Sequence, residues 1–358
     1  MPKSITSLLQ KLTLRRLAKF GLFLFALLLF TFALMLLREG ARQFGPFVRN
    51  SLDVNNAANA LGFGWLFAYS VMSGSPVAAI TLTLLDASAL NRLEAFAMIN
   101  GSRLGASFIV LFVGFIYYLR GRANKSSMST GLLSLLVTQT TYLPALFLGG
   151  LLLQSGWLDG FQMTEAAEMH SVFNLVFDPI VNLLLGFAPR WVLFFLGFAV
   201  LLGSFSLFDK SLPNFHLEES GFRDMARILY RPLFTFLLGA AVTFVTMSVS
   251  LSVSILVPLS VRGYVRRENI IPYVMGANIT TFIDTLVAAI LLGNTDAFTI
   301  VLLEMLSVGI VSLIIILLFY RSYERAVIRF SESILASRRN MMVYMFLIVG
   351  IPALLMLF

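Results

Sequence analysis

The chain has 358 residues, of which 58% are hydrophobic and only 12% are charged, with a formal net charge of +8. Soluble domains carry about 25% charged residues, so this composition excludes an ordinary soluble domain. Apolar runs long enough to cross about 30 Å of hydrocarbon as helices recur along the sequence. These runs do not alternate with polar residues as barrel strands do, so the predicted fold class is an all-α polytopic membrane protein.

The residue inventory also excludes several kinds of chemistry. There is no cysteine, so neither a disulfide framework nor a thiolate nucleophile is available. The two histidines, His170 and His216, are too far apart to form a metal-ligand motif. Most of the basic residues are arginines beside apolar spans, which report topology rather than nucleic-acid binding. We therefore expect no enzyme, no metal site and no cofactor.

The predicted elements begin with a basic N-terminal segment that leads into a first apolar span. This span is too long for a signal peptide and no small-residue cleavage site follows it, so we expect a retained helix with a cytoplasmic N-terminus. Residues 322–340 place arginines at helical spacing among apolar residues, which is typical of an interfacial helix. The predicted spans are 18–37, a broken stretch 61–85, 93–119, 130–154, a short 171–188, 191–208, a broken stretch 232–260, 270–293, 297–320 and 341–358.

An internal repeat is the main pattern in the sequence. The motif M-S-x-S starts at Met72 and again at Met247, and a polar interruption follows the two copies at Gly101 and at Gly276. The two methionines and the two glycines have the same separation in sequence. We expect each repeat to contain a broken-helix hairpin and a glycine-led polar helix break. The predicted divisions are repeat 1 (18–125), a connecting segment (126–190), repeat 2 (191–320), and an interfacial helix with a last transmembrane helix (321–358).

The distribution of basic residues predicts that the two repeats have opposite orientations. Basic clusters belong on the cytoplasmic side, whereas the acidic stretch 159–168 belongs outside. One arrangement places all of these clusters on their expected sides. Residues 61–90 enter the membrane from outside as a re-entrant hairpin, residues 232–260 enter it from inside, and residues 171–188 do not fully cross it. The predicted location is the plasma membrane, the inner membrane of a bacterium. This arrangement leaves four arginines outside: Arg38, Arg42, Arg49 and Arg92.

Interrupted helices at matching positions of inverted repeats predict a transport site near the middle of the membrane. A helix break exposes backbone N–H groups and carbonyls that can bind ions side by side. Arg103 and Asp284 are intramembrane charges, which are functional by default. Other interpretations stay open: the serines could hold helices together, the two glycines could serve packing, and Arg103 could reach the membrane surface or only neutralise Asp284.

Several motifs resemble the sodium–phosphate cotransporter family. MGANITTFIDT (275–285) is similar to its GANIGTT signature, and MSGSPVAAITL (72–82) and SVSLSVSILVPL (248–259) are similar to its two Q-S-S-S segments. MHSVFN (169–174) resembles a segment between the family's repeats, and residues 21–40 resemble its opening segment. The resemblance implies symport of inorganic phosphate with sodium, at a site formed by re-entrant hairpins of two inverted repeats.

The repeat and the resemblance together point to one set of site residues. The resemblance extends over roughly residues 20–320 and makes His170 and Asn174 structural neighbours of the site. The expected ion-coupling residues are Ser102, Thr280 and Asp284. The expected substrate-binding residues are Ser73, Ser75, Arg103, Ser248, Ser250, Asn278 and Thr281.

The chain departs from the family pattern where Met72 and Met247 stand in place of both glutamines. Sodium prefers oxygen ligands, so proton coupling through Asp284 is an alternative to sodium coupling. Two functions stay open. One is a secondary active transporter of inorganic phosphate or a similar small oxyanion; the other is a transport-incompetent sensor or partner subunit on the same scaffold. The expected partners are the oxyanion and the lipid bilayer, with no nucleic acid, and a homodimer stays open beside a monomer.

Overall fold

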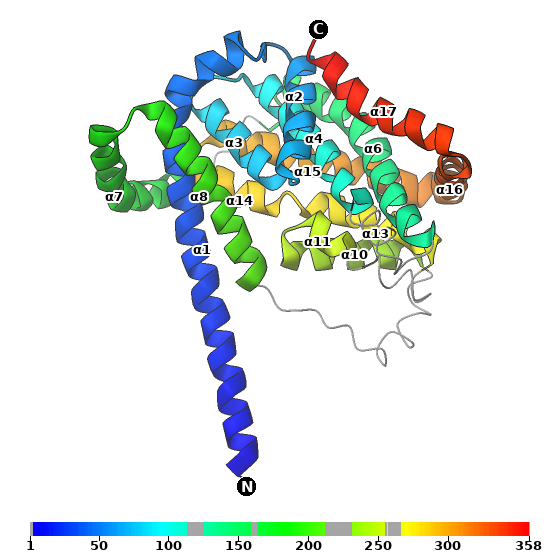
Figure 1. Ribbon diagram of the computed structural model, residues 1–358, viewed down its shortest axis with the longest axis horizontal. Helices are drawn as coiled ribbons and strands as arrows, with labels where there is room; N and C mark the ends of the chain where they lie inside the picture. Colours follow the sequence, from blue (N-terminus) through cyan, green and yellow to red (C-terminus); the bar gives the residue numbers. More distant parts are fainter. Residues whose placement is uncertain are drawn as a thin grey trace.

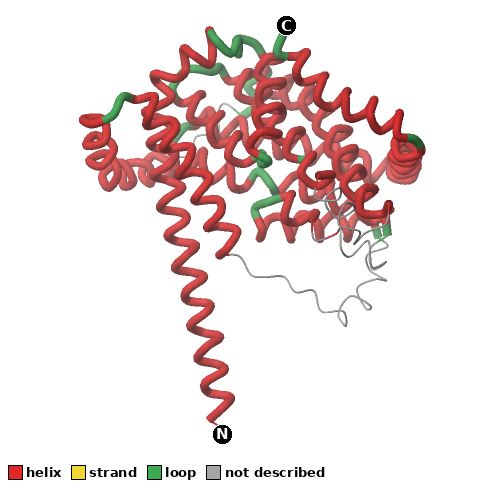
Figure 2. Tube along the Cα trace, viewed as in Figure 1, coloured by secondary structure: helices red, strands yellow, loops and turns green. Residues whose placement is uncertain are grey.

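The computed structural model describes residues 3–112, 125–158, 164–211, 231–254, 256 and 266–357. Every regular element within these residues is a helix, as Figure 2 shows. The described part is therefore all-helical and consistent with a polytopic membrane protein, as the composition predicts. Within it, seven helices are long and apolar enough to cross a membrane: Leu17–Asn50, Arg92–Phe112, Met128–Gln154, Arg190–Ser211, Arg267–Leu292, Thr295–Ala336 and Arg338–Leu355.

The first helix, α1 (Lys3–Asn50), extends beyond the rest of the bundle and packs along α8 (Arg190–Ser211) (Figure 1). Small residues allow this close approach, because a Cβ added at Gly40 would collide with the backbone of α8. Aromatic rings fill the remainder of the interface, with Phe30 and Phe205 in edge contact at a centroid distance of 5.4 Å. The predicted spans 18–37 and 191–208 are the apolar parts of this pair. The short predicted span 171–188 lies in α7 (Thr164–Phe187).

The first broken stretch is a hairpin of two helices that packs on a third. α2 ends at Val71, and the next residue, Met72, has a φ of 55°, which places it in the left-handed region and turns the chain. α3 then begins at Ser75 and has a proline in its first turn, where the missing N–H is no loss. The elements are α2 (Ala57–Val71), α3 (Ser75–Asp86) and α4 (Arg92–Ala106).

The second broken stretch repeats this geometry at the separation that the sequence predicts. Met247, the counterpart of Met72, also adopts a left-handed conformation, with a φ of 50°. A Cβ at Gly64 would overlap the Met98 carbonyl oxygen, and one at the equivalent Gly239 would overlap the carbonyl oxygen of Tyr273, which corresponds to Met98. Helix starts, turns and close contacts therefore recur between the two units. The second unit consists of α10 (Pro232–Thr246), α11 (Val249–Ser254) and α13 (Arg267–Thr280).

The prediction that the helices break at the two glycines is wrong. Gly101 and Gly276 lie inside α4 and α13, where an added Cβ would overlap carbonyl oxygens of α2 and α10. They are packing glycines, and their small size lets two backbones touch. The helices instead break more than one turn later, at Ser107 and at Thr281 and Phe282. The chain then resumes as α14 (Ile283–Leu292).

The C-terminal part wraps around this core. α15 (Thr295–Ile314) continues through a π-helical turn into α16 (Tyr320–Ala336), and Ser337 separates α16 from α17 (Arg338–Leu355). α16 buries its Val327, Ser331 and Ile334 side and exposes its charged side, so it is amphipathic; its position at the membrane interface stays a prediction. α6 (Lys125–Gln154) packs between the repeated units and α15.

The four arginines that the predicted topology leaves outside have acidic neighbours. An ion pair offsets part of the cost of burying each of these guanidinium groups, but it does not change the topology that the arginines predict, because acidic residues contribute little to the positive-inside rule. Arg42 pairs with Glu39 within α1 at 2.9 Å. The other ion pairs connect different elements and are Arg38 with Asp86 at 2.6 Å, Arg49 with Glu94 at 3.3 Å and Arg92 with Asp296 at 3.5 Å.

Candidate functional site

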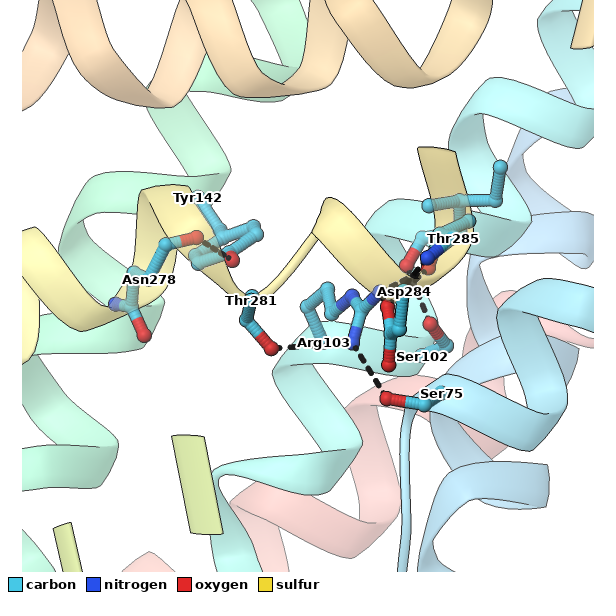
Figure 3. Close-up of polar contacts among 9 residues, drawn as sticks. Ser75, Ser102, Arg103, Tyr142, Asn278, Thr281, Asp284 and Thr285 are labelled. Atoms are coloured by element: carbon cyan, nitrogen blue, oxygen red, sulfur yellow. Dashed lines mark hydrogen bonds and ion pairs between the residues drawn. The ribbon is translucent and has the colours of Figure 1, made fainter. Parts of the chain in front are cut away.

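Arg103 lies at the centre of the buried polar residues, as Figure 3 shows. It occupies the last turn of α4, where the helix dipole favours a cation, and only 5% of the residue is exposed. Nη1 donates to the hydroxyl of Ser75 at 3.3 Å and to that of Thr281 at 3.4 Å. Nη2 donates to Asp284 Oδ1 at 3.4 Å and to the hydroxyl of Thr285. The guanidinium therefore connects α3, α4 and the start of α14.

The ion pair between Arg103 and Asp284 leaves hydrogen-bonding capacity unused. Asp284 Oδ1 also accepts from the backbone N–H and the hydroxyl of Thr285. Among the described residues, Asp284 Oδ2 and Arg103 Nε are buried with no hydrogen-bond partner. The guanidinium also lies over the ring of Phe282, 4.6 Å from the centroid, which favours a cation at this place. Four of the five guanidinium N–H groups are thus used within the protein, and the Nε–H is the one left without a partner, so two parallel hydrogen bonds to an oxyanion require Arg103 to release some of its present partners.

A small polar cavity adjoins Arg103 and receives side chains from both repeats. Its volume is about 20 Å³, which is enough for one water molecule. Six of the seven residues predicted to bind substrate line it, whereas the side chain of the seventh, Ser250, lies outside the described residues. The structure thus brings together residues that are far apart in sequence. The six are Ser73, Ser75, Arg103, Ser248, Asn278 and Thr281.

A larger cavity of about 210 Å³ lies beside α1 and α8. Ser73, Ser75 and Ser248 line both cavities, so the two M-S-x-S segments stand between them. The carboxyl groups of Asp284 and Asp209 also line the larger cavity, and its opposite wall consists of aromatic and aliphatic side chains of α1 and α8. This cavity is large enough for a hydrated small ion.

The GANITT segment is held in place by α6. The Asn278 side chain donates to Thr138 Oγ1 at 3.2 Å, and its backbone carbonyl accepts from the hydroxyl of Tyr142 at 2.7 Å. Both partners come from α6, which belongs to the segment between the two repeats and to neither of the repeated units. The amide of Asn278 is therefore oriented at the cavity wall by residues that the sequence does not single out.

The other predicted residues occupy less central positions. The hydroxyl of Ser102 donates to the Ile99 carbonyl at 2.7 Å, and that of Thr280 donates to the Ala240 carbonyl at 2.8 Å. Neither residue lines either cavity, and their hydroxyls already serve backbone carbonyls. Asn174 is in α7 and also lines neither cavity. The side chain of His170 and the whole of His216 lie outside the described residues.

Glu304 is a buried ionisable residue that the sequence analysis missed. It is fully buried in α15, and its Oε2 accepts from Asn100 Nδ2 at 3.2 Å. Asn100 belongs to α4, one turn before Arg103. A signal was available, because Glu304 is the only charged residue between 297 and 320 and intramembrane charges mark functional positions.

Comparison with known proteins gives no match to a family model, a curated protein or a solved structure. The class of protein therefore rests on the fold and the site themselves. Seven apolar helices of membrane-spanning length in the described part indicate a multi-pass α-helical membrane protein. Its distinguishing feature is a buried arginine beside a polar cavity lined by both repeated units.

Proposed function

We propose that this chain is a secondary active transporter of inorganic phosphate or a similar small oxyanion. The observation that carries the proposal is the shared cavity, which Ser73, Ser75 and Ser248 line together with Arg103, whose guanidinium donates to the Ser75 hydroxyl. Hydroxyl and guanidinium donors are the groups that recognise an oxyanion, and the guanidinium offers two parallel hydrogen bonds. The motif resemblance to sodium–phosphate cotransporters supports phosphate as the first substrate to test.

Inverted orientation of the two repeats is part of this proposal. α4 starts at Arg92, which pairs with Asp296 just beyond the end of α14, and it ends at Arg103, which pairs with Asp284 at the start of α14. α4 is therefore antiparallel to α14, which continues the chain from α13, the counterpart of α4. This relationship supports repeats that exchange access between the two sides of the membrane. A bacterial inner membrane and a cytoplasmic N-terminus are part of the proposal because of the distribution of basic residues.

Phosphate binding requires a change at the small cavity. A space of about 20 Å³ accommodates water and not a tetrahedral oxyanion. We propose that Arg103 exchanges Asp284 for the oxyanion as the two M-S-x-S hairpins separate. Because Ser73, Ser75 and Ser248 also line the larger cavity, the ion would enter from the α1–α8 side.

The motif resemblance favours sodium as the coupling ion, and the two methionines argue for an alternative. Met72 and Met247 form the left-handed turns of the hairpins, and a thioether is a poor ligand for sodium. The buried Oδ2 of Asp284 has no hydrogen-bond partner among the described residues, and Asp284 lines the larger cavity. A carboxylate oxygen in this position could take sodium or a proton.

A second candidate function is that of a sensor or partner subunit that does not transport. The ion pair between Arg103 and Asp284 favours it, because the protein's own carboxylate already occupies the guanidinium. Such a protein would respond to an oxyanion that competes with Asp284, with no net movement across the membrane.

Uptake of radiolabelled phosphate into proteoliposomes, with and without a sodium or pH gradient, separates these functions. Losing a hydrogen bond to a charged ligand costs about 1.5–3 kcal/mol, so the double variant Ser73→Ala/Ser248→Ala should lose most uptake. Ser155→Ala is the matched control, because its hydroxyl donates to a backbone carbonyl at the exposed end of α6. Phosphate binding without uptake would identify the sensor. Equal uptake by both variants would show that Ser73 and Ser248 are not part of the phosphate site.

A further inference from the structure

Glu304 and Asn100 form a buried pair that the proposed oxyanion site does not use. Their one hydrogen bond, from Asn100 Nδ2 to Glu304 Oε2, leaves Glu304 Oε1 and Asn100 Oδ1 buried with no partner among the described residues. With an ionised carboxylate, both of these oxygens would be acceptors that lack a donor. A protonated carboxyl supplies the missing donor, because a carboxylic acid and a primary amide form two hydrogen bonds in a ring. A neutral acid would therefore satisfy this pair, whereas an ionised carboxylate would leave two buried acceptors without a donor.

The charges around Glu304 lead to the same protonation state. Arg103 on α4 is the cation whose charge acts on Glu304, but its donors are directed to Asp284 on α14 and to nearby hydroxyls. Tyr142 on α6 donates its hydroxyl to the Asn278 carbonyl. No lysine or arginine among the described residues forms an ion pair with Glu304. Full burial without a paired cation strongly disfavours an ionised carboxylate.

The position of this pair connects it to the oxyanion site. Asn100 and Arg103 are on the same helix, one turn apart, so a displacement of α4 that freed Arg103 from Asp284 would also displace Asn100 relative to Glu304 on α15. Separation removes the acid–amide pair and admits water, which favours release of the proton from the Glu304 carboxyl.

We propose that Glu304, rather than Asp284, is the residue that carries the coupling proton of this transporter. The inference rests on the proposed function. In the closed conformation the Glu304 carboxyl holds one proton against Asn100. When α4 moves on the side where the oxyanion leaves, the O–H bond breaks and the proton goes to water on that side. After the site reorients, the carboxylate takes up a proton from water on the opposite side, together with the next oxyanion. One proton would therefore move with each oxyanion.

Infrared spectroscopy of the purified protein tests the protonation state without any transport. We expect the C=O stretching band of a protonated carboxyl group at neutral pH, and its loss in Glu304→Gln, which keeps the shape and the amide partner. Glu332→Gln is the matched control, because Glu332 is an exposed carboxylate on α16 paired with Arg267. A native protein without this band, or a band that persists in Glu304→Gln, would overturn the proposal.

Transport assays in proteoliposomes test the coupling role. Glu304→Gln resembles the protonated form permanently. It should therefore keep phosphate exchange in the absence of a proton gradient and lose the stimulation of uptake by an inward proton gradient, with the outside more acidic. Glu332→Gln should keep both. If Glu304→Gln keeps this stimulation, or if the native protein requires sodium instead of a proton gradient, Glu304 is not the coupling residue. Either result is compatible with phosphate transport by this protein. If the native protein neither binds nor exchanges phosphate, the proposed function fails and the coupling role fails with it, whatever the infrared band shows.

Discussion

Arg103 Nη2 lies 3.4 Å from Asp284 Oδ1, and each side chain is only 4% exposed. The two residues come from different repeats, so this contact joins the end of α4 to the start of α14. Attraction between buried charges is offset by the loss of hydration, and a buried ion pair is therefore weak evidence for stability by itself. A buried guanidinium that can exchange a carboxylate of the protein for an oxyanion is better suited to ligand binding than to stabilising the fold.

Removing one charge of this pair should destabilise the protein strongly. We expect Arg103→Gln and Asp284→Asn each to lower the free energy of unfolding by about 3–5 kcal/mol, because each leaves one buried charge unpaired. The double variant should recover much of this loss. Thermal unfolding in detergent provides the measurement. Arg42→Gln is the control, because its exposed pair within α1 is worth about 1 kcal/mol or less. Single variants as stable as the native protein would show that the pair does not form.

Phosphate binding should depend on the shape of the guanidinium and not only on its charge. Lysine cannot reproduce two parallel hydrogen bonds to an oxyanion, so Arg103→Lys should fold and bind phosphate more weakly. Arg103→Gln should bind almost none. Calorimetric titration of phosphate into the purified variants provides the measurement. Undiminished binding by a folded Arg103→Gln protein, or by the double variant with Asp284→Asn, would remove Arg103 from the site.

The packing glycines should not tolerate a methyl group. Gly101→Ala and Gly276→Ala place a Cβ against carbonyl oxygens of the neighbouring helices α2 and α10, and overpacking of this kind costs about 1–3 kcal/mol. Gly203→Ala on α8 is the matched control, because nothing lies within 4 Å of its added Cβ. The control should be neutral or gain up to about 1 kcal/mol from better helix propensity. Similar melting temperatures for all three variants would contradict the close approach of the repeated helices.

Glutamine at the two hairpin turns should raise the sodium dependence of phosphate uptake. Met72 and Met247 are unbranched residues in left-handed turns, so glutamine can replace them with little change in backbone strain. An amide oxygen at each turn would supply the ligand that a thioether cannot. We expect the Met72→Gln/Met247→Gln protein to show greater sodium stimulation of phosphate uptake than the native protein. Steep sodium dependence of the native protein would show that the methionines do not weaken coupling.

The absence of cysteine from the sequence makes the predicted membrane topology directly measurable. Single cysteines can be placed at Asn55, Ser155 and Ser337, which are exposed in the structure. In intact cells an impermeant maleimide should label Asn55→Cys and Ser155→Cys, whereas Ser337→Cys should react only after the membrane is opened. Labelling of Ser337→Cys in intact cells would contradict a cytoplasmic α16 and the predicted orientation of the N-terminus.

The sequence by itself determined the class of protein, the broken hairpins and the repeated unit. Apolar run length decides which segments are long enough to cross a membrane, and this is a local property. The constant separation between the two copies predicted equivalent turns, and Met72 and Met247 adopt the same left-handed conformation. The repeat is readable because equivalent positions carry similar residues in both copies, whatever their orientation in space.

Only the tertiary structure decided which polar groups face the cavity and which face a neighbouring backbone. Ser73 and Ser248 line the cavities, whereas the hydroxyls of Ser102 and Thr280 donate to backbone carbonyls, and the sequence around them does not distinguish these outcomes. The same is true of the bond between Glu304 and Asn100, which joins residues 204 positions apart. Such contacts depend on how helices distant in sequence approach one another, and that approach is set by packing across the whole bundle rather than by local periodicity.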